Sequence, residues 1–95
     1  MIKVKVRQNS IDVQGHAGAA PRGQSVPCAG ISAMTWMLGR GLKDIVNLPD
    51  FRLHIDDGIV SMRWGQLTQS AEDMIDVWFL GLCDIAEEYG CVEFV

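Results

Sequence analysis

The sequence of 95 residues is poor in the groups that build metal sites, disulfide frameworks and nucleic-acid surfaces. Its three cysteines are odd in number, widely spaced and without a Cys-x-x-Cys pair, which argues against a disulfide framework and against a zinc site. The chain has 8 lysine and arginine residues and 12 aspartate and glutamate residues, so its net charge is negative, and the basic residues are scattered along the chain. We therefore expect no metal, no cofactor and no direct contact with nucleic acid.

Long apolar runs are also absent. No stretch is apolar enough over 18 or more residues to cross a membrane, and the start, Met1 to Arg7, alternates like a strand and lacks the apolar core of a signal peptide. The sequence shows no low-complexity tail, no interdomain linker and no repeat beyond a rough strand-strand-helix duplication. Because 48% of the residues are apolar, the chain can build one core. We expect one domain over residues 1–95, located in the cytosol and without membrane contact.

The apolar pattern predicts the order of the strands and helices. Alternation predicts two hairpins, the second turned at Asp57-Gly58, with strands over Ile2–Arg7, Ile11–Ala17, Phe51–Asp56 and Ile59–Trp64. Helical spacing predicts one helix over Cys28–Leu42, ended or loosened by Gly39 and Gly41, and a longer one that stops at Gly90. A short strand over Cys91–Val95 follows. The order ββαββα with a terminal strand predicts an α+β sandwich in which helices cover a mainly antiparallel sheet.

The second helix also predicts how the chain associates. Ser70 and Asp73 resemble a capping box at its start, and one apolar stripe is expected to face the core, namely Met74, Val77, Trp78, Leu82, Ile85 and Tyr89. Leu80 and Cys83 lie outside this stripe, among acidic residues, and Phe79 lies at the boundary. Apolar side chains on an acidic face predict a second contact surface, and we expect a homodimer, although scattered exposed apolar residues are also ordinary.

A histidine and a cysteine, twelve positions apart, are the best clue to chemistry. Ser25 can cap a helix and Pro27 suits its first turn, so Cys28 lies where a helix begins. Unsatisfied N–H groups and the helix dipole favour a negative sulfur there, and a thiolate is the nucleophilic form of cysteine. His16 ends a predicted strand and faces a loop of small residues, where a scaffold can aim a side chain. A buried structural cysteine and an ordinary histidine remain the alternative.

The combination is more specific than the spacing. Gly15-His16-Ala17, a short loop closed by Gly23, and Cys28-Ala29-Gly30-Ile31-Ser32 together resemble the Prp family, the ribosomal-processing cysteine proteases of certain bacteria. The Asp56-Asp57-Gly58 turn and the helix end at Ala86-Glu87-Glu88-Tyr89 agree more weakly.

The resemblance implies a function. It implies a cytoplasmic bacterial endopeptidase that removes a short N-terminal extension from a large-subunit ribosomal protein, with Cys28 as nucleophile and His16 as general base. It also implies a homodimer. Ser32 matches a serine one helical turn after the family's cysteine, where a supporting hydrogen bond and a bond back to its own helix are about equally expected. Ser25 and Gly15 are further supporting residues.

The chain also departs from the family's pattern. Relatives carry an acidic-aliphatic-aliphatic triplet before the cysteine, and this chain has Ser25-Val26-Pro27. The expected substrate loop is built from small and turn-forming residues and includes Gly18, Pro21, Arg22 and Gly23, without the aromatic and acidic residues common in relatives. A divergent member, such as one borne by a mobile element and aimed at another protein, would carry these differences. A catalytically silent relative that binds a peptide or the ribosome, and a structural dimer, remain as alternatives.

Other residues have weaker claims to the site. Asp12 shares the even spacing of His16 on its strand, but a solvated carboxylate is the stronger interpretation. His54 is expected to be solvated beside Arg52. Trp36 and Trp64 could bind an apolar side chain of a peptide if they lie near the site, but core packing is the stronger interpretation for both. A Cys-His dyad is therefore the predicted catalytic unit.

Overall fold

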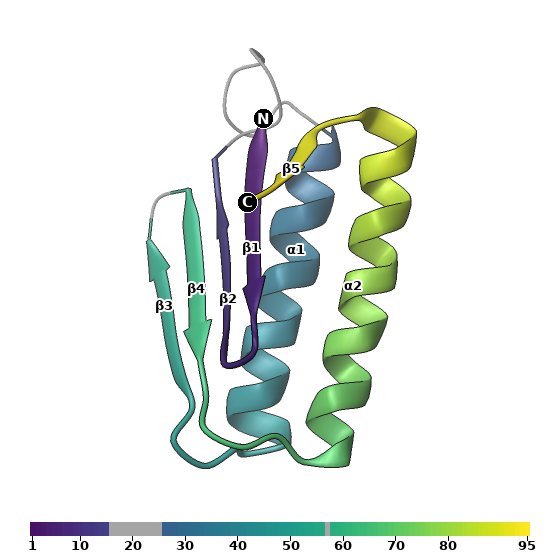
Figure 1. Cartoon of the computed structure of the whole chain (residues 1–95). Coiled ribbons are helices and arrows are strands. Elements are labelled where there is room, and N and C mark those ends of the chain that lie inside the picture. The colour runs from purple at the N-terminus through teal and green to yellow at the C-terminus, as the bar shows by residue number, and fades with distance from the viewer. Residues whose placement is uncertain (16–25, 57) are drawn as a thin grey trace.

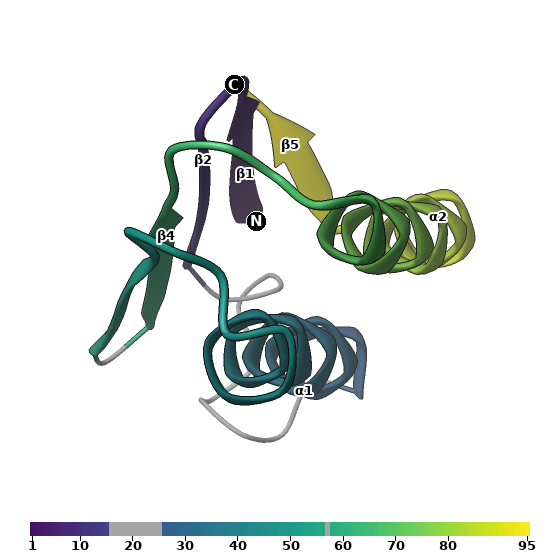
Figure 2. The ribbon, with the colours of Figure 1, turned by 90° about the horizontal axis from the view of Figure 1, so that it is seen from below.

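One five-stranded sheet carries two helices on one of its faces (Figures 1 and 2). The computed structural model describes residues 1–15, 26–56 and 58–95. The elements in chain order are β1 (Ile2–Arg7), β2 (Ser10–Gln14), α1 (Val26–Arg40), a π-helical turn η1 (Gly41–Ile45), β3 (Arg52–Asp56), β4 (Ile59–Arg63), α2 (Gln69–Tyr89) and β5 (Val92–Phe94). The expected α+β class, with helices covering a mainly antiparallel sheet, is confirmed.

The strand order, which the sequence did not indicate, is β3-β4-β2-β1-β5. Three neighbouring pairs are antiparallel, and β5 runs parallel to β1. The register aligns apolar residues across the strands, with Val4 opposite Val13, Val13 opposite Val60 and Val60 opposite Ile55. Because side chains alternate along a strand, this row and the next one, which holds Ile11 and Met62, face the helices and form the core.

The first helix differs from its predicted limits. It begins at Val26 rather than Cys28, and the winding continues past Gly39 and Gly41 as the π-helical turn η1. A Cβ on Gly41 would meet the methyl group of Met74 on α2, so a larger residue there would require the flexible Met74 side chain to move. β2 begins at Ser10 instead of Ile11, and the predicted end of its strand at Ala17 lies outside the described residues.

Two expectations for α2 are wrong. Its N-cap is Thr68, whose hydroxyl accepts a hydrogen bond from the Ala71 N–H at 3.2 Å, so Ser70 and Asp73 do not form the cap. The buried face is narrower than the predicted stripe, because Val77 is 71% exposed and Tyr89 54% exposed, whereas Ala71 is buried. Val77 lies at the edge of the face turned to α1, and Tyr89 ends the helix.

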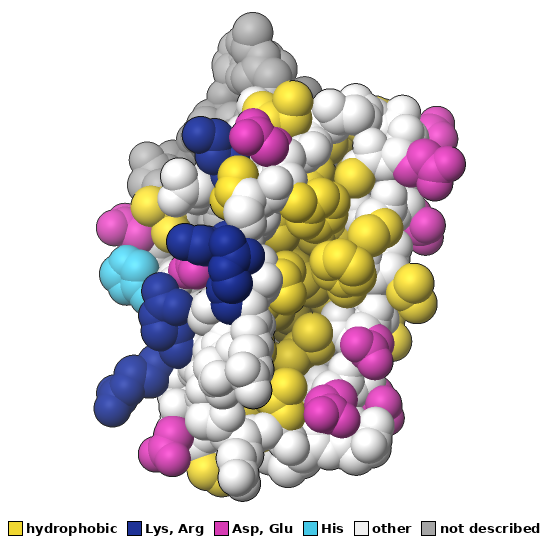
Figure 3. Space-filling view, viewed as in Figure 1, with side chains coloured by type: hydrophobic (Ala, Val, Ile, Leu, Met, Phe, Trp, Pro, Cys, Tyr) yellow, Lys and Arg dark blue, Asp and Glu magenta, His cyan; other side chains and the backbone are white. Residues whose placement is uncertain are grey.

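Basic side chains gather over the sheet, and acidic side chains lie along α2 (Figure 3). The open face of the sheet gathers five of the 8 basic residues. Lys3, Lys5 and Arg7 alternate along β1, as on a solvated strand face, and Arg52 of β3 and Arg63 of β4 join them. Asp12 lies among them, accepting hydrogen bonds from Ser61 and from Arg63. His54 is solvated on the same face, as expected, with its Nε2 4.0 Å from Asp56. Within the described ranges, no helix is long and apolar enough to cross a membrane.

One buried polar contact joins the helices. The Thr35 hydroxyl on α1 donates to the Ile31 carbonyl at 2.7 Å and accepts from the Trp78 indole N–H of α2 at 3.1 Å. Thr35 is fully buried and Trp78 nearly so. A buried indole N–H without a partner is costly, so this bond fixes how α1 and α2 face each other.

We predict that Thr35→Val lowers the free energy of unfolding by about 1–3 kcal/mol, because valine keeps the shape but leaves the Trp78 N–H without its acceptor. Urea denaturation followed by far-ultraviolet circular dichroism measures the change. In the double variant Thr35→Val/Trp78→Phe both partners are gone, so its loss should be smaller than the sum of the two single losses. Strictly additive losses would contradict this role.

Candidate active site

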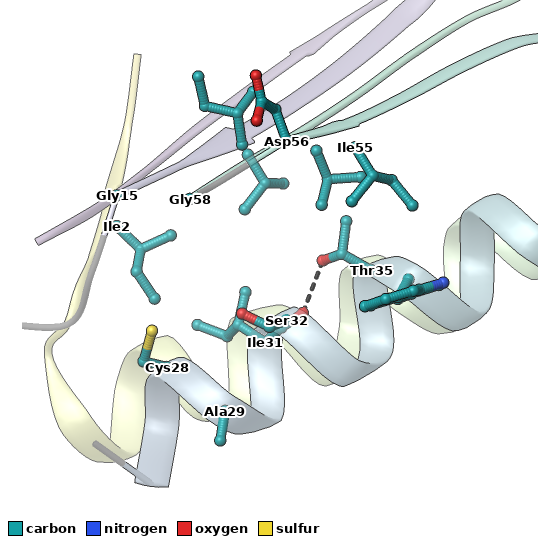
Figure 4. A pocket seen from close by; sticks show the side chains of 14 residues that line it. Ile2, Gly15, Cys28, Ala29, Ile31, Ser32, Thr35, Ile55, Asp56 and Gly58 are labelled. Atoms are coloured by element: carbon teal, nitrogen blue, oxygen red, sulfur yellow. Dashed lines mark hydrogen bonds between the residues drawn. The ribbon is translucent and has the colours of Figure 1, made fainter. Parts of the chain in front are cut away.

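The predicted nucleophile lies in the first turn of α1 and lines a cavity between that helix and the sheet. Cys28 is the third residue of α1 and is 8% exposed. Its sulfur points from the helix toward Ile2 at the start of β1 (Figure 4). Pro27, one residue earlier, has no N–H to leave unsatisfied in that turn. The first-turn N–H groups that α1 does not use internally are therefore close to the sulfur.

The cavity has a volume of about 260 Å³ and a mixed lining. α1 contributes one wall and the ends of four strands contribute the other (Figure 4). The lining includes Ile2 of β1, Val13 of β2, Ile55 and Asp56 of β3, and Ile59 and Val60 of β4. Apolar walls around a small number of polar groups are typical of ligand sites.

Ser32 lies one helical turn after Cys28 and lines the same cavity. Its side chain is exposed, and Figure 4 shows it on the face of α1 that carries Cys28. The next turn adds Thr35, whose hydroxyl bonds back to Ile31. The structure thus brings three of the sequence-predicted site residues, Cys28, Ser32 and Gly15, to one cavity.

Gly15 brings the end of β2 to this cavity. Its N–H donates to the Gly58 carbonyl at 3.0 Å, which ties β2 to the turn between β3 and β4. Its φ of +103° is a conformation that side chains disfavour, and a Cβ there would come within 2.8 Å of the Met1 carbonyl oxygen. Only glycine therefore fits, and the backbone that leads into His16 is held at Gly15.

The remaining predicted residues lie outside the described ranges. These are His16, Ser25 and the proposed substrate-loop residues Gly18, Pro21, Arg22 and Gly23. Asp12 is described, and it lies on the open face of the sheet with Ser61 and Arg63, whereas Cys28 is on the helix side. Asp12 therefore does not reach the thiol, in agreement with the solvated interpretation.

Sequence reasoning missed some of the lining. Asp56 was recognised only as part of a hairpin turn, yet it lines the cavity with Ile55. Trp36 was expected in the core and is instead 52% exposed at the cavity, whereas Trp64 is buried as expected. Asp56 could have been found from its position at a strand end. Trp36 could have been found from its spacing of eight residues from Cys28, which brings it near the same helix face.

The cysteines differ in their surroundings. All three lie in the described ranges and none forms a disulfide bond. Cys91 is buried and Cys83 half-buried, and neither lines the cavity. Among the described residues, no group of three or more histidine, cysteine or carboxylate side chains is placed to hold a metal ion. The arrangement can present a sulfur nucleophile and backbone N–H donors to a peptide carbonyl.

Comparisons with known proteins bear on the family and the fold of the chain. The model of the family described as cysteine protease Prp matches residues 1–92. The solved structures that resemble this chain include the essential ribosomal processing protease Prp from S. aureus with a covalently linked product peptide (TM-score 0.75, 22% identity, 98% of this chain and 94% of that chain covered). SMU.848 from Streptococcus mutans is also similar (TM-score 0.71, 19% identity, 98% and 89% covered). No curated protein sequence matches the chain.

We predict that Gly15→Ala destabilises the protein more than Gly90→Ala, and by about 2 kcal/mol or more in total. Both glycines have positive φ, but Gly90 (φ +61°) has open space around it, so it measures the conformational strain alone. The excess at Gly15 reports the collision with the Met1 carbonyl. Urea denaturation of both variants tests this, and equal losses would mean that the close approach of β1 to Gly15 is unimportant.

Proposed function

Because the chain belongs to the Prp family of cysteine proteases, we propose that it removes a short N-terminal extension from a large-subunit ribosomal protein, with Cys28 as nucleophile and His16 as general base. The observation that carries the proposal is the position of Cys28, in the first turn of α1 and at the wall of a cavity next to the strand end that leads to His16. The S. aureus Prp structures, one with a substrate peptide and one with a product peptide, support a peptide as the ligand of such a cavity.

The mechanism follows from the chemistry of thiols. The Cys28 sulfur attacks the scissile carbonyl carbon, and the oxyanion that forms accepts hydrogen bonds from N–H groups at the start of α1. The C–N bond then breaks as His16 delivers the thiol's proton to the leaving amine. Water hydrolyses the thioester and restores Cys28. Ser32 and Ser25 support the site, Gly15 holds the strand end before His16, and the segment with Gly18, Pro21, Arg22 and Gly23 contacts the substrate.

The proposal places the enzyme in the bacterial cytoplasm, where ribosomal proteins are made, as one domain over residues 1–95. It needs no metal or cofactor. A catalytically silent relative that binds a peptide or the ribosome is the second candidate, and the observation that favours it is the Ser25-Val26-Pro27 sequence, which lacks the acidic residue of relatives. A purely structural dimer is the third.

We predict that Cys28→Ala abolishes cleavage of the ribosomal protein while binding and folding persist, whereas Cys83→Ala retains full activity because Cys83 does not line the cavity. Cleavage of the purified substrate protein is followed by mass spectrometry. Retained cleavage in Cys28→Ala would exclude this nucleophile, and binding without cleavage by the wild type would favour the silent relative.

A labelling experiment tests the dyad without a substrate. In the folded protein at neutral pH, iodoacetamide should label Cys28 faster than Cys83 and Cys91, because the helix start and an imidazole favour the thiolate. His16→Ala should remove that advantage, and urea-unfolded protein should label all three at similar rates. A folded Cys28 that labels as slowly as the buried Cys91 would argue against the dyad.

The homodimer is also part of the proposal. An apolar strip runs between α2 and the short strand β5 (Figure 3). It includes the rings of Phe79 and Phe94, whose centroids are 5.9 Å apart. Cys83, four residues after Phe79 on α2, is half-buried. Leu80 is 67% exposed on the adjoining face of α2. Apolar surface of this kind supports contact with a second copy.

We predict that Leu80→Asp converts the dimer to a monomer without unfolding the chain, because an exposed side chain bears no core packing. Light scattering measures the mass and circular dichroism the fold. The matched control is Val77→Asp, which adds the same charge at a similarly exposed position of α2, on the side turned to α1, and should leave the mass unchanged. A wild type that is already monomeric would contradict the dimer.

A further inference from the structure

A second and larger hollow lies between the two helices and takes no residue from the sheet. It has a volume of about 490 Å³ and is lined by Met34, Met37, Leu38, Asp73, Met74, Val77, Trp78 and Gly81. We call it the methionine groove, because three of the chain's five methionines line it. It is separate from the Cys28 cavity, with which it shares no lining residue.

The lining of the groove includes a glycine of α2, Gly81. A Cβ on Gly81 would come within 2.8 Å of the Met34 methyl group, so Met34 lies over the space that a side chain would occupy. Met37 is 73% exposed and Val77 71% exposed at its rims. Methionine side chains are flexible and polarisable, and surfaces rich in them adapt to apolar side chains of different shapes.

The carboxylates around the groove favour a positively charged ligand. α2 has no lysine or arginine and six carboxylates, namely Glu72, Asp73, Asp76, Asp84, Glu87 and Glu88. Asp73 lines the groove itself, and Asp84 lies on the same helix face as Val77. The only charged residue of α1, Arg40, is paired with Asp44 at 2.7 Å. A second copy whose α2 entered this groove would bring carboxylates against Asp73, so charge complementarity favours a cationic partner in the groove itself.

The groove adjoins the catalytic cavity along α1. Trp36 lines the cavity, and the next residue, Met37, lines the groove. A polypeptide that leaves the cavity across α1 therefore reaches the groove without crossing the sheet.

We propose that the methionine groove binds a cationic, amphipathic segment of the same protein that the Cys28 site cleaves, at a distance from the cleaved bond. This rests on the proposed function. Proteins that bind RNA carry lysine and arginine to neutralise phosphates, so a ribosomal protein supplies the required charge. The apolar side chains of the segment cover Met37 and Val77 while its basic residues face the carboxylates of α2.

The first test does not depend on catalysis. Cys28→Ala protein labelled with ¹³C at the methionine methyl groups is titrated with a helical peptide of leucine and lysine, and with its counterpart in which glutamate replaces lysine. The lysine peptide should shift the signals of Met34, Met37 and Met74, and leave the buried Met62 unchanged. An absence of shifts in the groove, equal shifts with the glutamate peptide, or shifts on changing the protein concentration alone would each overturn the proposal. The last result would mean that a second copy occupies the groove.

A matched pair of variants locates the binding. Val77→Lys puts a positive charge in the groove, which repels the lysines of the peptide, and should weaken binding of the lysine peptide by about tenfold or more. Tyr89→Lys makes the same charge change at an exposed position near the end of the same helix, outside the groove lining, and should weaken binding of the lysine peptide by about twofold or less. If both variants weakened binding of the lysine peptide equally, the effect would come from the overall negative charge of α2, and the groove would not be the binding site.

The second test asks whether the substrate protein itself binds in the groove. In the active enzyme, Val77→Lys should raise KM for the full-length ribosomal protein about fivefold or more and leave kcat/KM unchanged for a short peptide that spans only the cleaved bond. An equal effect on both substrates would overturn the link. If the wild type cleaves neither, the proposed function fails, and the methyl shifts still decide whether the groove binds a cationic segment.

Discussion

The hydrogen bond between Trp78 and Thr35 is the constraint on which the arrangement of the two helices depends. It is buried, so neither group can exchange its partner for water, and the helices can meet in only a few ways that keep it. Thr35 lies seven residues after Cys28 on the same helix and itself lines the Cys28 cavity. The contact that fixes α1 against α2 therefore also fixes the wall from which the sulfur points, and the close approach at Gly41 and Gly81 follows from the same packing.

Positive and negative charges lie on different surfaces of the molecule, and the proposed sites lie on the helix side of the sheet. The sheet's open face collects basic residues around Asp12, and α2 carries only acidic ones. Cys28 lies between these surfaces, where the strand ends meet the start of α1. A peptide lying across α1 would thus pass from a small cavity suited to one bond to a broader, negatively charged groove, so cleavage and recognition can be separated along one helix.

Particular residues show how far the sequence could lead. The strands of the hairpins were predictable because alternation is a local signal, and β1 and the α+β class were predicted correctly. The predicted turn residue Asp57 lies outside the described residues. Cys28 at a helix start followed from Pro27 and the apolar spacing behind it. The cap of α2 was misplaced because Thr68 and Ser70 are both good caps, and only the observed backbone decides which hydroxyl meets an N–H. Val77 was assigned to the core because periodicity gives a direction on one helix but not the position of the neighbouring helix.

By itself, the sequence determined the element order, the placement of a thiol at a helix N-terminus and a family-specific stretch from Gly15 to Ser32, because each of these depends on residues close together in the chain. Tertiary structure alone decided the parallel pairing of β5 with β1, the walls of the Cys28 cavity and the groove opposite Gly81. These depend on contacts between residues far apart in the sequence, and their geometry is set by close packing of side chains rather than by any local preference.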